Sequence, residues 1–141
     1  MRIPFLISGA DLGPRRVSAM ALNLDLAPTA LDLAGLPVPA EMQGRSLAKL
    51  LRGEPAPPRE SFLYEYQEES FLPVVPDILA VRTASRKYVT YPGSPSEVEL
   101  YDLLSDPSEM KNLAGLPDWA AAQAALRQEL DRLLAETGAP R

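Results

Sequence analysis

Before residue 53, the apolar positions of the chain follow the period of short helices. Residues 23–35 predict a helix of about two turns, with Asp25 as its N-cap and Gly35 as its stop. Its apolar residues recur at the spacing of one buried face: Leu26, Ala30, Leu33 and Ala34. Residues 44–53 repeat this arrangement, with Ser46 as the cap and Gly53 as the stop. In front of both, the β-branched and aromatic run 3–7 predicts a short buried strand.

After the proline-dense stretch 54–58, the apolar period changes to two. Four segments of strand length follow, at residues 62–66, 79–83, 87–91 and 98–101, and the second and third are close enough to form a hairpin. Asp118 then predicts the start of a long helix that ends near Gly138. Its apolar stripe consists of Leu126, Leu130, Leu133 and Leu134. The pattern therefore predicts an α+β fold, with an antiparallel sheet of about four strands covered on one face by the last helix, and a domain boundary near residue 53.

Composition removes several classes of function. The 141 residues include no cysteine and no histidine, which excludes disulfides, thiolate nucleophiles, cysteine-type zinc sites and a histidine proton shuttle. The net charge of -5 argues against binding to nucleic acid or to anionic membranes. The longest apolar runs fall far below the ~20 residues of a membrane span, and residues 1–7 are too short an apolar stretch for a signal peptide. As it stands, the chain is expected to be cytoplasmic.

Two groups of side chains invite a chemical interpretation. Lys87 with Tyr88 and Tyr91, near Arg82, could form a cationic patch that receives a sulfate or a carboxylate. The simpler interpretation is a hairpin on which outward charges alternate with inward aromatic residues. An acidic group, consisting of Glu65, Glu68 and Glu69, could hold a divalent cation, but a solvated acidic loop explains it better. We therefore predict no metal site in the chain.

Taken in order, several strings of the sequence resemble one family. Residues 1–9, 23–29, 31–35 and 43–47 resemble the closing part of the sulfatase catalytic domain, within the alkaline phosphatase-like superfamily. The later strings look like the C-terminal subdomain of arylsulfatases and N-sulfoglucosamine sulfohydrolases: residues 62–66, 80–83, 86–89, 99–103 and 112–114, with Asp106, Pro107 and Glu109. The resemblance implies that residues 1–53 are the terminal strand and helices of a large, incomplete α/β domain. Residues 54–141 would then form the small C-terminal α+β subdomain.

The resemblance also implies which parts of a sulfatase are missing. In that family the formylglycine, the calcium ligands and the catalytic Lys and His residues precede the segment that residues 2–9 resemble. The string Ser105 to Glu109 is similar to the formylglycine motif, but Glu109 stands in the place of its arginine, and a turn explains the string better. We therefore expect no catalytic residue and no cofactor in this chain, and no sulfatase activity from the chain alone.

What the chain would supply is packing and a rim over the substrate pocket. Tyr66, Gln67 and Arg82, near the ends of the first two predicted strands, are the candidates for that rim. The partners implied are the missing N-terminal sulfatase domain and, in the full enzyme, a sulfated small molecule or sugar. An export signal of such an enzyme would lie upstream. Two alternatives stay open: a standalone structural or interaction module derived from a sulfatase tail, and the tail of a related phosphodiesterase or phosphonate hydrolase.

Overall fold

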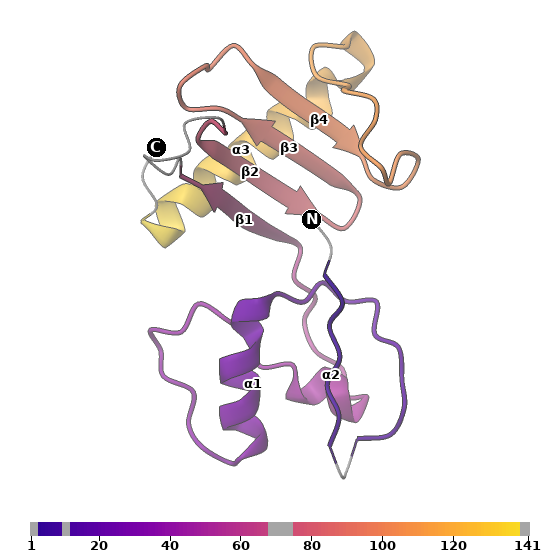
Figure 1. Ribbon diagram of the computed structural model, residues 1–141, viewed down its shortest axis with the longest axis vertical. Helices are drawn as coiled ribbons and strands as arrows, with labels where there is room; N and C mark the ends of the chain where they lie inside the picture. The colour runs from indigo at the N-terminus through magenta and orange to yellow at the C-terminus, as the bar shows by residue number, and fades with distance from the viewer. Residues whose placement is uncertain (1–2, 10–11, 68–74, 139–141) are drawn as a thin grey trace. The chain divides into compact units, whose positions relative to one another are not determined.

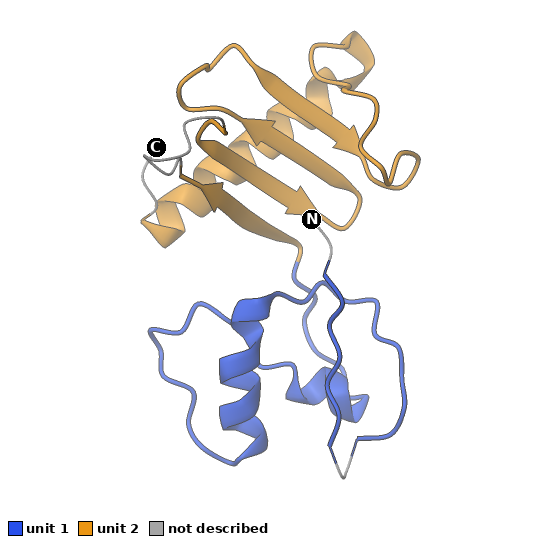
Figure 2. Ribbon diagram, viewed as in Figure 1, with its two compact units in different colours: residues 1–59 blue, residues 60–141 orange. Residues whose placement is uncertain are grey.

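The chain divides into two compact units, which Figure 2 distinguishes by colour. The computed structural model describes residues 3–9, 12–67 and 75–138. Unit 1 spans Met1–Arg59 and unit 2 spans Glu60–Arg141. The division thus follows the proline-dense stretch 54–58 instead of preceding it.

Unit 2 contains a four-stranded antiparallel sheet in the strand order β1-β2-β3-β4 (Figure 1). The strands are β1 (Ser61–Tyr66), β2 (Ile78–Thr83), β3 (Arg86–Thr90) and β4 (Val98–Asp102). Only residues 84 and 85 separate β2 from β3, and the Thr83 hydroxyl closes this hairpin by accepting the Arg86 N–H at 2.9 Å. The sheet confirms the change of period to two that the sequence displays after residue 58.

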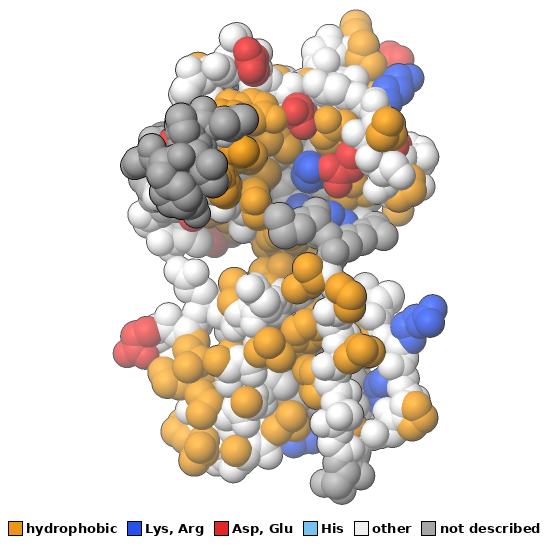
Figure 3. All heavy atoms as spheres, viewed as in Figure 1, with side chains coloured by type: hydrophobic (Ala, Val, Ile, Leu, Met, Phe, Trp, Pro, Cys, Tyr) orange, Lys and Arg blue, Asp and Glu red, His pale blue; other side chains and the backbone are white. Residues whose placement is uncertain are grey.

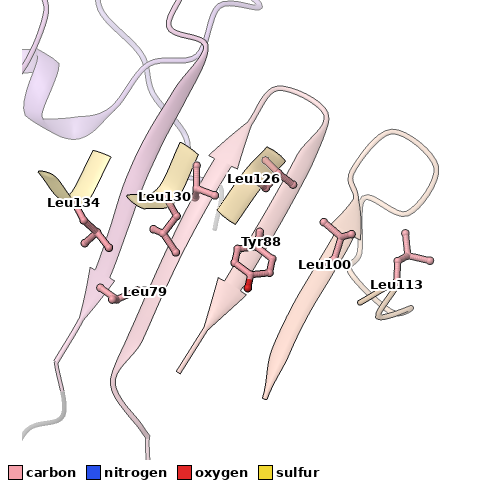
Figure 4. Close-up of a cluster of buried hydrophobic side chains, with 8 residues drawn as sticks. Leu79, Tyr88, Leu100, Leu113, Leu126, Leu130 and Leu134 are labelled. Carbon is pink, nitrogen blue, oxygen red and sulfur yellow. The ribbon is translucent and has the colours of Figure 1, made fainter. Parts of the chain in front are cut away.

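Helix α3 (Ala120–Thr137) covers one face of this sheet. Figure 4 shows the resulting core, in which leucines of α3 meet side chains from the strands. The buried cluster consists of Leu79, Val81, Tyr88, Leu100, Leu113, Leu126, Leu130 and Leu134, with Leu133 packed against it. The predicted leucine stripe of the last helix is therefore confirmed, and so is the α+β architecture of this part.

The expected cap of the last helix is wrong. Asp118 lies inside a 3-10 turn, η2 (Pro117–Trp119), and the N-cap residue of α3 is Trp119, which makes no side-chain cap hydrogen bond. The turn begins earlier because the Trp119 N–H donates to the Leu116 carbonyl at 2.9 Å. At the other end, Gly138 has a φ of 67°, the left-handed stop that the sequence predicts.

Unit 1 contains the 3-10 turn η1 (Asn23–Asp25) and the helices α1 (Leu26–Leu33) and α2 (Ala48–Arg52). Both helices form where the sequence predicts them, but the burial of α1 is reversed. Leu26 and Leu33, from the predicted buried stripe, are 47% and 39% exposed, whereas Pro28 and Thr29 are buried. The polar face turns inward because Thr29 accepts the Leu47 N–H at 2.9 Å and donates to the Asp25 carbonyl at 2.5 Å.

Residues 3–7 do not form the predicted strand. Residues 3–9 have no regular structure, and Leu6 is 93% exposed. A strand requires a hydrogen-bonded neighbour. Within the described ranges, the only strands are β1 to β4, and they pair with one another.

Candidate functional site

The structure brings two of the three rim candidates together. Tyr66 ends β1 opposite Ile78, and Gln67 follows it with an exposed side chain. Arg82 pairs with Phe62, which precedes Tyr66 by four positions in β1, or about 13 Å along the strand. Because β1 and β2 are antiparallel, their C-terminal ends lie at opposite ends of the strand pair. Arg82 therefore lies away from Tyr66 and Gln67.

Tyr66 and Gln67 border a small hollow of about 70 Å³ at their end of the sheet. The residues that line it are Glu65, Tyr66, Gln67, Asp77, Ile78, Leu79 and Pro92. A broader depression of about 620 Å³ also reaches Ile78 and is lined by Tyr91, Glu97 and Glu99 among others. The described residues of both linings include carboxylates and do not include Lys or Arg. Among the described residues, this end of the sheet therefore offers ring faces and hydrogen-bond acceptors to a substrate, but no cation to a sulfate group.

The predicted cationic patch is neutralised by its neighbours. Lys87 forms an ion pair with Glu109, and its ammonium lies 5.3 Å from the centre of the Tyr101 ring. Tyr88 is absent from this patch, because it points to the opposite face of the sheet and is buried in the core with α3. No local pattern in the sequence identifies Glu109 as the partner of Lys87. Since the two residues are 22 positions apart, only the fold brings them together.

Glu99 holds two tyrosines on the face of the sheet opposite α3. The Tyr91 hydroxyl donates to its carboxylate at 2.6 Å and the Tyr101 hydroxyl at 2.9 Å. The hydrogen bond to Glu99 raises the pKa of Tyr91 to about 12. Burial, followed by the same carboxylate, raises the pKa of Tyr101 to about 12. Both phenols therefore stay protonated at neutral pH, which makes them hydrogen-bond donors and unsuitable as bases or nucleophiles. The alternation of Val98, Glu99 and Leu100 was the available sequence signal for this outward carboxylate.

Asp25 lies at the centre of a buried ion pair that the sequence analysis missed. Its fully buried carboxylate accepts two hydrogen bonds from the Arg59 guanidinium, at 2.6 and 2.7 Å. It also accepts the N–H groups of Leu22 and Arg45, each at 2.8 Å. Burial raises the pKa of Asp25, but the bonds from Arg59 and the two N–H groups outweigh it, so the net pKa is lowered. Asp25 stands at the start of α1 as predicted, but its carboxylate makes no side-chain cap bond to the helix. It joins three segments of unit 1 instead.

The string that is similar to the formylglycine motif forms a turn, as its simpler interpretation predicts. The Asp106 carboxylate accepts the Lys111 N–H at 2.8 Å, and the Asp106 carbonyl accepts the Glu109 N–H at 3.1 Å. The Ser105 hydroxyl donates to Asp102 at 2.9 Å. With Glu109 in the place of the motif's arginine, these residues do not fit a formylglycine site.

The carboxylates of the described residues do not fit a calcium site either. Among the residues with a defined placement, no three acidic side chains come close enough to share a metal ion. Glu68 and Glu69, from the acidic string, lie outside the described residues. None of the helices in the described ranges combines the length and the hydrophobicity that crossing a membrane requires.

Comparison with known proteins assigns the chain to a family. Residues 1–136 match the family described as N-sulphoglucosamine sulphohydrolase, C-terminal. An N-acetylglucosamine-6-O-sulfatase of Bacteroides thetaiotaomicron is 38% identical over 123 residues, which cover 85% of this chain and 21% of that protein. The chain therefore spans about a fifth of the length of this relative.

Solved structures agree with the sequence match. A 2-O GAG sulfatase aligns with a TM-score of 0.75 and 38% identity, over 82% of this chain and 25% of that one. A phosphonate monoester hydrolase of Agrobacterium radiobacter aligns less well, with a TM-score of 0.65 and 26% identity, over 79% of this chain and 24% of that one. The chain belongs to the N-sulphoglucosamine sulphohydrolase C-terminal family and corresponds to the C-terminal part of a sulfatase.

Proposed function

We propose that this chain works as the C-terminal part of a sulfuric ester hydrolase whose catalytic groups all come from a preceding N-terminal part. The observation that carries the proposal is the family match over residues 1–136, in a chain that spans only 21% and 25% of the two sulfatases compared above. Sulfate-ester hydrolysis of this kind needs a strong nucleophile, a metal that polarises the sulfuryl oxygens and a proton donor for the leaving group. This chain has no cysteine and no histidine, and its formylglycine-like string lacks the arginine.

Within such an enzyme, the end of the sheet that carries Tyr66 and Gln67 would form part of the substrate rim. The carboxylates in both nearby linings would repel the sulfate group, so this rim would contact the uncharged part of the substrate. The names of the two sulfatase relatives, which refer to N-acetylglucosamine and to GAG, support a sulfated sugar as that substrate. Arg82 would not share this rim, because it lies at the other end of the β1–β2 pair.

A chimera tests the proposal. This chain would replace the matching 123-residue segment of the Bacteroides N-acetylglucosamine-6-O-sulfatase. We expect the chimera to hydrolyse N-acetylglucosamine 6-sulfate, as the name of the parent enzyme indicates. We expect the isolated chain, assayed with calcium, to hydrolyse neither this ester nor an aryl sulfate nor an aryl phosphate. A folded chimera without sulfatase activity would contradict the proposal. So would turnover by the isolated chain that a substitution within it abolishes.

The same chimera also tests whether Gln67 contacts the substrate, through the constants KM and kcat. Gln67→Ala should raise KM for a sulfated sugar about 3- to 10-fold and leave kcat unchanged, because it removes one hydrogen bond made equally in the ground and transition states. Gln128→Ala, which truncates an exposed glutamine on α3, is the matched control and should change neither constant. Equal effects of the two substitutions would remove Gln67 from the rim.

A further inference from the structure

The charges of the chain are divided unevenly between the two units. Unit 1 has seven Lys or Arg side chains against five Asp or Glu, a net charge of +2, whereas unit 2 has seven against 14, a net charge of -7. In Figure 3, Lys and Arg side chains appear on the side of unit 1 where Figure 1 places α2. The acidic balance of the whole chain therefore comes from unit 2, and unit 1 is basic.

Three cations of unit 1 meet at the C-terminal end of α2. Lys49 and Arg52 are the basic residues of its last turn and, being three positions apart, are neighbours on the surface of the helix. The Arg15 guanidinium reaches the same end from an earlier segment. Its Nη1 atom lies 3.5 Å from the Leu50 carbonyl oxygen, and a Cβ on Gly53 would come within 2.9 Å of its central carbon. We define the basic patch as these three cations and the residue after Arg15, all of them exposed: Arg15, Arg16, Lys49 and Arg52.

No carboxylate balances this patch. Among the described residues, none of its four cations forms an ion pair with an acidic side chain. Glu54 is the nearest acidic residue along the chain, and it bonds to the carbonyl of Lys49 through its own backbone N–H, at 2.8 Å. The terminal carbonyls of a helix attract cations, which explains the position of Arg15 at Leu50. The remaining like charges repel one another, and an anion from outside the chain would relieve that repulsion.

We propose that the basic patch binds a sulfated polysaccharide. The choice of this ligand class rests on the proposed function, in which the substrate is a sulfated sugar. Guanidinium groups match the oxygens of such anions with charge-assisted hydrogen bonds. The residues of the substrate rim and of both hollows described above belong to unit 2, whereas the patch belongs to unit 1. The patch is therefore a second binding surface, which would hold the enzyme on a polymer.

An extended anion suits the patch better than a single sulfate does. All four cations are exposed to water, where one ion pair contributes only ~0–1 kcal/mol. A polymer with many sulfates contacts several cations at once and releases its condensed counterions, so the small contributions add. A nucleic acid is also a polyanion, but the binding of single strands uses aromatic side chains on which the bases stack. Unit 1 contains one aromatic residue, Phe5, so a nucleic acid is the alternative outcome of the test.

The test removes two cations of the patch that support no part of the fold. The side chains of Arg16 and Arg52 make no hydrogen bond to the described residues, so Arg16→Gln with Arg52→Gln should move Tm by no more than about 2 °C. Fluorescence anisotropy of a labelled heparin oligosaccharide measures binding to the chain. At about 50 mM salt, the patch pair should bind at least ~3-fold more weakly than the wild type. The slope of log K against log salt concentration should become shallower by ~2, about one for each cation removed.

Lys111→Gln with Arg127→Gln is the matched control in unit 2. Both side chains are exposed, and this control pair changes the net charge from -5 to -7, as the patch pair does. It should change heparin binding less than about 2-fold, because salt screens exposed charges that are distant from the ligand. Arg16→Lys with Arg52→Lys keeps both charges and should keep the salt slope. Desulfated heparin and a DNA duplex of similar length are the ligand controls, and both should bind more weakly than heparin.

The same comparison in the chimera described above decides whether the patch is accessible in a whole enzyme. Binding is measured there without added calcium, so that turnover does not consume the ligand, and the patch pair should weaken it as in the isolated chain. Equal effects of the patch pair and the control pair, in either context, would overturn the inference. Equally tight binding of DNA or of desulfated heparin would also overturn it. An inactive but folded chimera contradicts the proposed function alone, because the binding measurements still decide on the patch.

Discussion

The buried ion pair of unit 1 gives a stability prediction that the structure makes quantitative. Arg59→Met removes the guanidinium and keeps a side chain of similar reach. In the native chain, the Arg59 and Asp25 side chains are 7% and 0% exposed and share two hydrogen bonds. After the substitution, the Asp25 carboxylate stays buried with only the N–H groups of Leu22 and Arg45. Removing one partner of a buried pair costs ~3–5 kcal/mol, because the other charge is left without compensation.

Arg132→Met provides the matched control on the surface of unit 2. Arg132 also pairs with carboxylates, those of Glu129 and Glu136, but its own side chain is 49% exposed. Water and salt screen such pairs, which typically contribute ~0–1 kcal/mol. We therefore expect the two arginine substitutions to differ by at least ~2 kcal/mol in the free energy of unfolding.

Two spectroscopic signals distinguish the unfolding of the two units. Trp119 and all five tyrosines lie in unit 2, so tryptophan fluorescence reports on that unit, whereas far-UV circular dichroism also includes α1 and α2. In urea, Arg59→Met should move part of the circular dichroism transition to a lower midpoint and leave the fluorescence transition of Trp119 in place. The reasoning would be refuted by a loss below ~1 kcal/mol, the range of a surface pair, or by an equal shift in both signals.

The same pair sets a pH dependence. The folded-state pKa of Asp25 is lowered, so its contribution to stability is present above the unfolded value of about 3.9 and is lost as the pH falls through the folded value. The difference between the wild type and Arg59→Met should therefore be largest near pH 7 and shrink below pH 4. Urea midpoints at the two pH values check the sign. A difference that grows in acid would contradict it.

Two further predictions concern single contacts. Gly44→Ala should destabilise unit 1 by ~1–3 kcal/mol or more, because its Cβ would lie 2.0 Å from the Leu24 carbonyl oxygen. Gly93→Ala, where a Cβ meets no atom within 4 Å, is the control for the urea midpoint. Glu99→Gln should lower the pKa of Tyr91 from about 12 toward ~10, since it removes the negative charge that opposes phenolate formation. The pKa of Tyr101 should fall less, because burial, its largest cause, remains. Ultraviolet titration of the phenolates measures this shift, and unchanged values would contradict the assignment.

The local pattern of the sequence predicts most of unit 2, because the unit contains its own core. The period of two places the four strands, and the leucine stripe of 126–134 meets the face of the sheet that carries Val81 and Leu100. Only residues 84 and 85 join β2 to β3, so the register of this hairpin follows from its short connection. The start of α3 was predicted wrongly because Pro117 begins a turn of its own before the helix.

The rim was harder to predict, since it depends on the direction of the strands as well as on the position of each residue along its strand. Tyr66 and Arg82 are both near the C-terminal ends of their strands, but in an antiparallel pair those two ends lie at opposite ends of the sheet. The ion pair between Lys87 and Glu109 and the one between Asp25 and Arg59 join residues 22 and 34 positions apart. No local period encodes such pairs, and only the folded chain identifies them.

The errors in unit 1 have a common physical cause. The sequence predicts a buried stripe on α1 and a buried strand at residues 3–7. In the structure the stripe residues are exposed and residues 3–7 have no regular structure, because none of the described residues of the unit covers the stripe or pairs with residues 3–7. Apolar patterning indicates which surface must be buried, and it does not specify what buries it. The interior of the unit includes the Asp25–Arg59 pair and the bonds of Thr29, which hold the polar face of α1 in place. If this polar interior holds α1 in place, then Arg59→Met in the chimera should reduce enzyme activity, although Arg59 is not one of the rim candidates.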